Sequence, residues 1–227
     1  MELLGVTAVV IGMHAVVERV LVPRGVLAKH VEAVAVVGKL WCALYSVASL
    51  VGLLWWLLLA THVPVGTLLC GRVATGSLLW DAYFWSKLLE GLFDLTTVTL
   101  RFPVNAHFRY HHYTTPVFAS LGMMSNASHA FLFMGLNLFM HVMVYAFHAG
   151  VHIWWLRPTI RFWQNVQLFG GMLAAAIALG ARGILGRPCS PESWLGDAVP
   201  PLLFALYYVL FLDELREEAR NRSHKDE

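Results

Sequence analysis

Apolar stretches long enough to cross a lipid bilayer recur along almost the whole of this 227-residue chain. About 20 consecutive apolar residues span the hydrocarbon core as a helix, and only helices or closed barrels satisfy the backbone hydrogen bonds there. Charged residues make up 13% of the sequence and hydrophobic residues 58%, which is typical of a membrane protein. We therefore predict an all-α integral membrane protein with a single membrane domain, whose seven transmembrane helices lie near 2–22, 34–60, 77–100, 110–124, 129–151, 163–183 and 198–215.

The positions of the basic residues predict how these helices are oriented. Only Arg72, Arg182 and Arg187 fall on one side of the predicted domain. Apart from Lys87, which lies inside a predicted span, all other lysines and arginines fall on the opposite side. Because basic connections remain in the cytosol, the N-terminus is predicted to be non-cytosolic and segment 216–227 to be a charged cytosolic tail. The net charge of +2 is too small to suggest a nucleic acid partner.

Two of the three cysteines fall on the predicted non-cytosolic side. Cys70 and Cys189 lie in connections on that side, whereas Cys42 lies inside a predicted span. If that compartment is oxidising, a disulfide between Cys70 and Cys189 would join two loops. Two unpaired thiols are the alternative, because the sequence does not give the distance between them.

The third predicted helix carries charged residues on one face. A helix turns about 100° per residue, which places Glu90 about 60° and Asp94 about 20° from Lys87 around the helix axis. Tyr83, Thr97 and Arg101 share that face. Ionisable groups inside a membrane are costly and usually border a cavity or pathway. The alternative is a stripe of interhelical salt bridges that only holds the bundle together.

Histidines gather on two other predicted helices. Asn137, His141, Tyr145, His148 and His152 fall within a stripe about 80° wide on the fifth helix. Near the start of the fourth helix lie His107, His111 and His112, which could instead be interfacial residues. On the sixth helix, Gln164 and Gln167 are placed to hydrogen-bond across helices.

These side chains limit the chemistry that such a membrane domain could perform. Imidazole acts as a general base or as a nucleophile, and carboxylates such as Glu90 or Asp94 set its tautomer. Lys87 and the cytosolic arginines would suit the phosphates of a large anionic substrate, and an apolar tunnel would accept a lipid chain. Two alternatives stay open: a di-iron lipid desaturase or hydroxylase with histidine boxes, and a non-enzymatic seven-helix receptor or transporter.

Four motifs along the chain are similar to those of the very-long-chain fatty acid elongase (ELO) family. Lys87, Glu90 and Asp94 resemble the family's Lys-x-x-Glu-x-x-Asp-Thr motif, with one extra residue before the aspartate and Leu95 in the threonine position. His111 and His112 resemble the end of its His-x-x-His-His box. Phe108 stands where the first histidine is expected, and His107 precedes it.

The two later motifs follow in the family's order. Asn137, His141 and Tyr145 resemble Asn-x-x-x-His followed by Met-Tyr, with Val144 in the methionine position. Gln164 and Gln167 resemble the late Gln-x-x-Gln, with Arg161 where threonine is usual. Together the four motifs extend from about Tyr83 to Gln167.

The resemblance implies a seven-helix fold in the endoplasmic reticulum membrane, with a lumenal N-terminus. Segment 1–22 would form a peripheral helix, and 34–215 a barrel of six helices around an acyl tunnel. The implied reaction condenses acyl-CoA with malonyl-CoA to 3-ketoacyl-CoA, CoA and carbon dioxide, through an acyl-histidine intermediate and without a cofactor or metal. Other enzymes of the elongation cycle and a second copy of the chain are the implied protein partners.

The resemblance also implies roles for individual residues. The catalytic residues would be His111, His112, His141 and His107. The supporting or substrate-binding residues would be Lys87, Glu90, Asp94, Asn137, Tyr145, His148, Gln164 and Gln167. Glu90 and Asp94 would orient imidazoles, and Lys87 would pair with them or meet a substrate phosphate.

Overall fold

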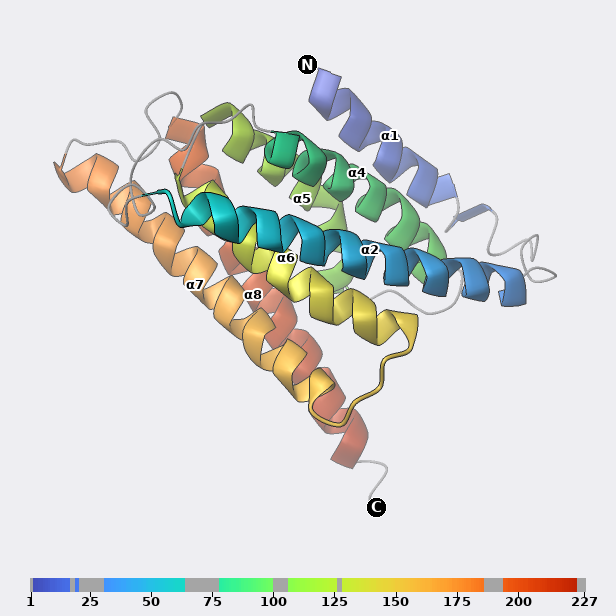
Figure 1. Ribbon diagram of the computed structural model, residues 1–227. Coiled ribbons are helices and arrows are strands. Elements are labelled where there is room, and N and C mark those ends of the chain that lie inside the picture. Colours follow the sequence, from blue (N-terminus) through green and yellow to red (C-terminus); the bar gives the residue numbers. More distant parts are fainter. Residues whose placement is uncertain are drawn as a thin grey trace.

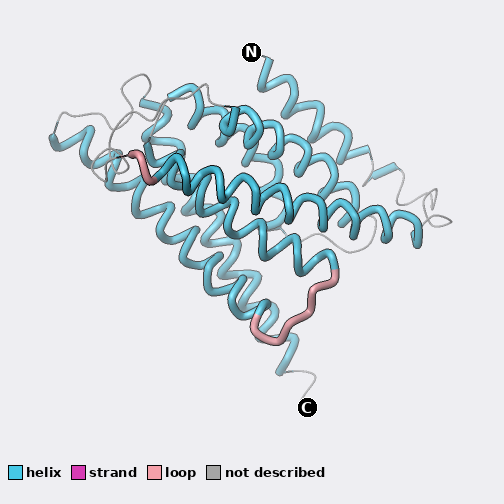
Figure 2. Tube along the Cα trace, in the orientation of Figure 1, coloured by secondary structure: helices cyan, strands magenta, loops and turns pink. Residues whose placement is uncertain are grey.

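A computed structural model describes residues 2–16, 19–20, 31–63, 78–99, 106–125, 128–185 and 194–223 of the chain. These residues form seven long helices and no strand, which confirms the predicted all-α class for the described part (Figures 1 and 2). The helices are α1 (Glu2–Val16), α2 (Val31–Ala60), α4 (Leu78–Thr99), α5 (Ala106–Ser125), α6 (Ser128–Ala149), α7 (Leu156–Leu185) and α8 (Trp194–Ser223). Cys70 and Cys189, the predicted disulfide partners, lie outside the described residues.

Each predicted stretch overlaps one of these helices, but three helices extend beyond the apolar pattern by four residues or more at one end. Helix α5 begins at Ala106 instead of 110, α7 begins at Leu156 instead of 163, and α8 continues to Ser223. The added turns are polar, so hydropathy alone assigned them to connections. Helix α8 therefore extends into the predicted tail, where glutamate and arginine are good helix formers.

Helix α6 ends earlier than predicted. Gly150 has a φ of 113°, which is the left-handed conformation that glycine adopts without strain. The Val151 N–H donates to the Ala146 carbonyl and the Gly150 N–H to the Phe147 carbonyl, as in a Schellman cap. His152 therefore lies in the loop after α6, and its predicted place in the polar stripe of that helix is wrong.

Six helices contact one another in a closed sequence. Helix α2 packs against α6, α6 against α7, α7 against α8, α8 against α5, α5 against α4, and α4 against α2. Helix α1 packs against α4 and α5 at the edge of this group (Figure 1). Side chains from six different helices can therefore point toward a common interior.

The outer faces of these helices are apolar. On α2, Leu44 and Leu58 are 69% and 67% exposed, and Leu202 on α8 is 72% exposed. Within the described ranges, three helical segments are long and apolar enough to cross a membrane: Glu32–Ala60, Ala130–Ala149 and Ala198–Glu217. Exposed apolar residues along such helices are what a lipid environment requires, so the chain is a membrane protein.

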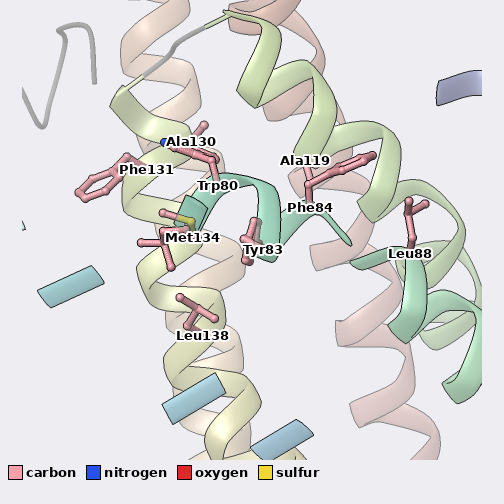
Figure 3. Packing of buried hydrophobic residues seen from close by; sticks show 10 residues of the cluster. Trp80, Tyr83, Phe84, Leu88, Ala119, Ala130, Phe131, Met134 and Leu138 are labelled. Atoms are coloured by element: carbon pink, nitrogen blue, oxygen red, sulfur yellow. The ribbon is translucent and has the colours of Figure 1, made fainter. Parts of the chain in front are cut away.

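An apolar cluster fills one part of the interior. It contains Leu79, Trp80, Tyr83, Phe84, Leu88, Ala119, Ala130, Phe131, Met134 and Leu138, from α4, α5 and α6 (Figure 3). Trp56 of α2 packs against this cluster, and its Nε1–H donates to the Phe131 carbonyl at 2.8 Å. Gly135 lies directly under the Trp56 ring, where a Cβ atom would collide with it. The absent side chain lets α2 and α6 approach closely.

Candidate active site

A cavity of about 410 Å³ lies among α2, α4, α5, α6, α7 and α8. Ten of the twelve residues predicted to be catalytic or supporting line it: Glu90, His107, His111, His112, Asn137, His141, Tyr145, His148, Gln164 and Gln167. Motifs separated by up to about 80 positions thus meet around one space. The other two are Lys87, which lies behind Glu90, and Asp94, whose side chain lies outside the described part.

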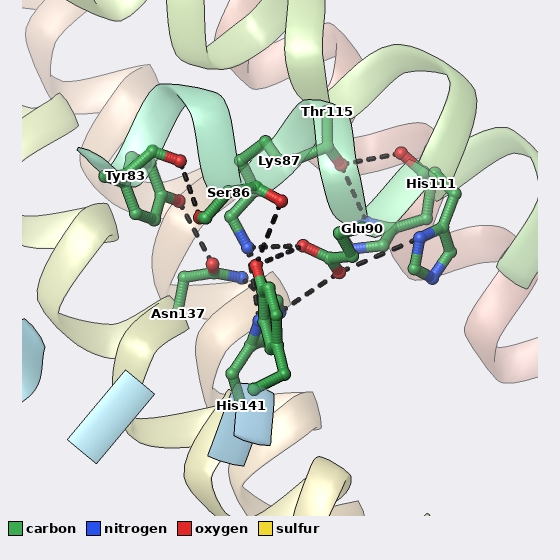
Figure 4. Close-up of polar contacts among 10 residues, drawn as sticks. Tyr83, Ser86, Lys87, Glu90, His111, Thr115, Asn137 and His141 are labelled. Atoms are coloured by element: carbon green, nitrogen blue, oxygen red, sulfur yellow. Dashed lines mark hydrogen bonds and ion pairs between the residues drawn. The ribbon is translucent and has the colours of Figure 1, made fainter. Parts of the chain in front are cut away.

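Lys87 and Glu90 form a buried ion pair on α4 (Figure 4). The Lys87 Nζ donates to Glu90 Oε2 at 2.7 Å, and the two residues are 2% and 3% exposed. Tyr45 of α2 also donates to Oε2, at 3.2 Å. A charge taken out of water needs such partners, because an unpaired ion in this environment is very costly. Of the two roles predicted for Lys87, pairing with a carboxylate or meeting a substrate phosphate, its position matches the first.

Glu90 also faces two imidazoles from other helices. Its Oε1 lies 3.5 Å from His141 Nε2 on α6 and 3.7 Å from His112 Nδ1 on α5. The Glu90 carboxylate therefore lies between the histidine box on α5 and the polar stripe on α6. Its position allows it to orient both rings and to stabilise positive charge that develops on either.

His141 is held by neighbours on more than one side. The Lys87 Nζ lies 3.2 Å from its Nδ1, and the Asn137 Nδ2 lies 3.2 Å from its Nε2. The Tyr83 hydroxyl donates to Asn137 Oδ1 at 3.0 Å, which turns the amide N–H group toward the imidazole. The His141 ring is thus fixed by the surrounding polar groups.

His111 is more accessible to the cavity. It is half-buried, and Thr115 Oγ1 lies 3.4 Å from its Nδ1. Its ring packs edge-on against His112 and against Tyr207 of α8. Within the described part of the chain, its Nε2 makes no hydrogen bond, so this nitrogen has the character of an available nucleophile.

The histidine box on α5 lines the cavity, although its first imidazole stands at position 107 instead of 108. Because α5 begins at Ala106, His107 lies one turn before His111, and their ring centroids are 6.0 Å apart. Phe108 lies one turn before His112 and stacks on it with centroids 4.1 Å apart. The rings of His107 and Phe108 both line the cavity. Compared with the family motif, the first imidazole of the box is therefore rotated around the helix but still lies in the site.

Comparison with protein families agrees with this arrangement. The model of the GNS1/SUR4 (ELO) family matches residues 4–227. The chain belongs to the ELO family. This is a family of fatty acid elongation enzymes, so the predicted resemblance is confirmed. Comparisons with curated proteins and with solved structures give no significant match.

Two residues of this candidate site were not found from the sequence. Tyr45 contacts Glu90, and its ring lies 4.4 Å from that of Tyr145 and 5.7 Å from that of His141. Glu214 on α8 lies beside His107. A tyrosine in an apolar span and a glutamate at the end of the last predicted span are ordinary features. Only the packing of α2 and α8 against the histidine helices brings them into the site.

The cavity also contains positive charge from α7. The early start of this helix places Arg157 and Arg161 on the cavity wall with Gln164. Among the described residues, no group of three His, Cys, Asp or Glu side chains is placed to hold a metal ion. Lys87 occupies the space beside Glu90, where a cation would otherwise bind the carboxylate.

Proposed function

We propose that this ELO family member catalyses the condensing step of fatty acid elongation, joining acyl-CoA and malonyl-CoA to give 3-ketoacyl-CoA, CoA and carbon dioxide. The observation that carries the proposal is the cavity, in which five imidazoles, two carboxylates and two arginines meet. Nucleophilic imidazoles suit an acyl transfer, and arginines suit the phosphates of a CoA thioester. The substrates supply the whole reaction, so no separate cofactor is proposed.

The first half of the reaction forms an acyl-imidazole. His111 Nε2 attacks the thioester carbonyl, the carbon–sulfur bond breaks, and CoA leaves as a thiolate that takes up one proton. The Asn137 amide and the Lys87 ammonium lie within hydrogen-bond reach of His141 and provide donors for the negative charge at this side of the site. This splits a difficult condensation into two easier steps.

The second half of the reaction forms the new carbon–carbon bond. Malonyl-CoA loses carbon dioxide, and the resulting enolate carbon attacks the acyl-imidazole carbonyl. The imidazole leaves, takes up a proton and regenerates His111. The ion pair between Lys87 and Glu90 keeps His112 and His141 in place through both halves, because Glu90 Oε1 faces both rings.

The membrane arrangement is part of the proposal. We propose seven spans with a lumenal N-terminus in the endoplasmic reticulum, segment 1–22, which includes α1, as the peripheral helix, segment 34–215 as the six-helix barrel, and 216–227 cytosolic. The closed sequence of helix contacts and the outward apolar residues support this arrangement. Glycosylation sites engineered before α1 and after Ser223 test it, since only the first should be modified.

The decisive experiment uses purified full-length protein with acyl-CoA and malonyl-CoA. Product 3-ketoacyl-CoA is measured by mass spectrometry, and protein incubated with acyl-CoA alone is analysed for an acyl group on histidine. His111→Ala and His141→Ala should each lower turnover by about 100-fold or more, because nucleophilic and acid–base groups contribute at least that much. His62→Ala is the matched control, since His62 is exposed in the turn after α2, whereas the α2 residues of the cavity lie in the first half of that helix.

Other results would favour the alternatives. Full activity in both His111→Ala and His141→Ala would refute the site assignment. Stoichiometric iron in the purified protein, with oxidation of the lipid chain, would replace the condensation by a di-iron reaction. Saturable binding of a ligand without any turnover would indicate a receptor or transporter.

A further inference from the structure

The inference concerns the histidine box, whose imidazole pattern differs from the family motif at two adjacent positions. Phe108 stands at the position of the first histidine, and His107 carries the imidazole instead. On a helix, adjacent residues differ by about 100° around the axis. The imidazole at position 107 therefore faces a different neighbour from one at position 108, and that neighbour is α8.

Helix α8 presents a carboxylate to this displaced imidazole. Glu214 Oε2 lies 3.1 Å from His107 Nδ1, and the side chains are 30% and 7% exposed. Phe211, one turn earlier on α8, packs against the His107 ring with centroids 5.6 Å apart. The ring is therefore held by a polar contact at one nitrogen and an apolar contact at its side.

The two carboxylates that line the cavity contact different imidazoles. Glu90 on α4 faces His112 and His141, whereas Glu214 on α8 faces His107. When a carboxylate accepts the proton of one imidazole nitrogen, the neutral ring presents its other nitrogen as a base. Glu214 bonded to Nδ1 thus leaves Nε2 of His107 as the basic atom, next to His111 on the same helix face.

We propose that Glu214 is a positioning residue that holds His107 for proton transfer, and that His107 carries the proton from the His111 imidazole to the departing CoA thiolate. The inference rests on the proposed function. In the acylation step, the bond between the acyl carbon and sulfur breaks and a carbon–nitrogen bond to His111 forms. The His111 ring gives up its N–H proton, and the thiolate needs one. Because His111 attacks through Nε2, this proton comes from its Nδ1. His107 accepts it at Nε2 through one water molecule and delivers it to sulfur, so His107 and Glu214 return to their initial state while His111 carries the acyl group.

The test is a double-mutant cycle on the full-length protein, with His107→Ala, Glu214→Gln and the combined variant. CoA release is followed in a single turnover with acyl-CoA, and kcat and KM are measured with both substrates. Glu214→Gln should lower kcat by about 10- to 100-fold with KM changed by less than about threefold, because an orienting partner acts on the step and not on binding. In the His107→Ala background, the same substitution should have almost no further effect.

Three further variants separate positioning from folding. Glu214→Asp keeps the carboxylate and should recover part of the loss. Asp213→Asn, an exposed neighbour on α8, should match the wild type. The exchange of His107→Phe with Phe108→His restores the family spacing, turns the imidazole away from Glu214, and should make activity insensitive to Glu214→Gln.

The possible failures of the two proposals are distinguishable. If the wild type forms product but the losses from His107→Ala and Glu214→Gln combine independently, the positioning role is overturned while the condensing function stands. Wild-type turnover in Glu214→Gln would overturn it in the same way. If the wild type forms neither product nor acyl adduct, the proposed function fails and the inference fails with it.

Discussion

Helix α6 passes through two different environments, and they place different demands on its side chains. Near its start, Phe131 and Met134 are buried among apolar residues of α2, α4 and α5. Toward its end, His141 and Tyr145 border the cavity and contact polar groups of α2 and α4. The apolar part tolerates any arrangement that fills the space, whereas each polar group in the other part requires a particular partner.

The residues that pack the apolar core and the residues proposed to act in the reaction therefore lie on different parts of the same helices. Helix α4 shows the same division, because Trp80 and Phe84 lie in the apolar cluster while Lys87 and Glu90 lie at the site. Substitutions in the apolar part should therefore reduce stability without changing turnover. Substitutions at the site should affect both, because the site's charges are also buried.

The largest effect is expected from Lys87→Met. This change leaves Glu90 as a buried charge without its ammonium partner, which should lower the free energy of unfolding by about 3–5 kcal/mol and abolish turnover. Thermal unfolding in detergent, followed by tryptophan fluorescence, measures the stability change. Replacing the pair by Lys87→Met with Glu90→Leu should recover part of the stability but none of the activity. Equal stability of Lys87→Met and wild type would show that the pair does not hold the site together.

A smaller and selective effect is expected from Met134→Ala in the apolar cluster. Met134 is fully buried, so its truncation should lower the free energy of unfolding by about 2–4 kcal/mol. At a temperature where the variant remains folded, kcat should equal that of the wild type. A large fall in kcat without loss of stability would mean that the cluster and the cavity are not separate in function.

The smallest effect is expected at the contact between α7 and α8. A Cβ atom on Gly171 would lie 2.6 Å from Phe204 Cε1, so Gly171→Ala should separate the helices slightly, at a cost of about 1–3 kcal/mol. Because α7 carries Gln164 and Gln167 to the cavity, KM should rise more than kcat falls. Gly170→Ala is the matched control, since nothing lies within 4 Å of its Cβ position. If both variants behave alike, the close approach at Gly171 has no role.

The sequence by itself determined the helices and the faces that carry the polar side chains. Apolar runs predicted the seven helices of the described part, and the 100° periodicity predicted that Lys87 and Glu90 share one face and Asn137 and His141 another. These properties are local, because they depend on residues a few positions apart. The boundaries of α5, α6, α7 and α8 were predicted less well, since polar helical turns look like loops in a hydropathy pattern and the Gly150 cap acts at a single residue.

Only the tertiary structure decided which groups meet. The distances from Glu90 to His112 and His141 depend on how α4, α5 and α6 rotate against one another, and Tyr45 joins them because α2 packs on α6. The sequence also did not determine which group His107 contacts. Its partner is Glu214, which the packing of α8 against α5 brings beside it. Periodicity fixes the direction of a side chain relative to its own helix, whereas the contacts between helices are set by side-chain packing, which no local pattern records.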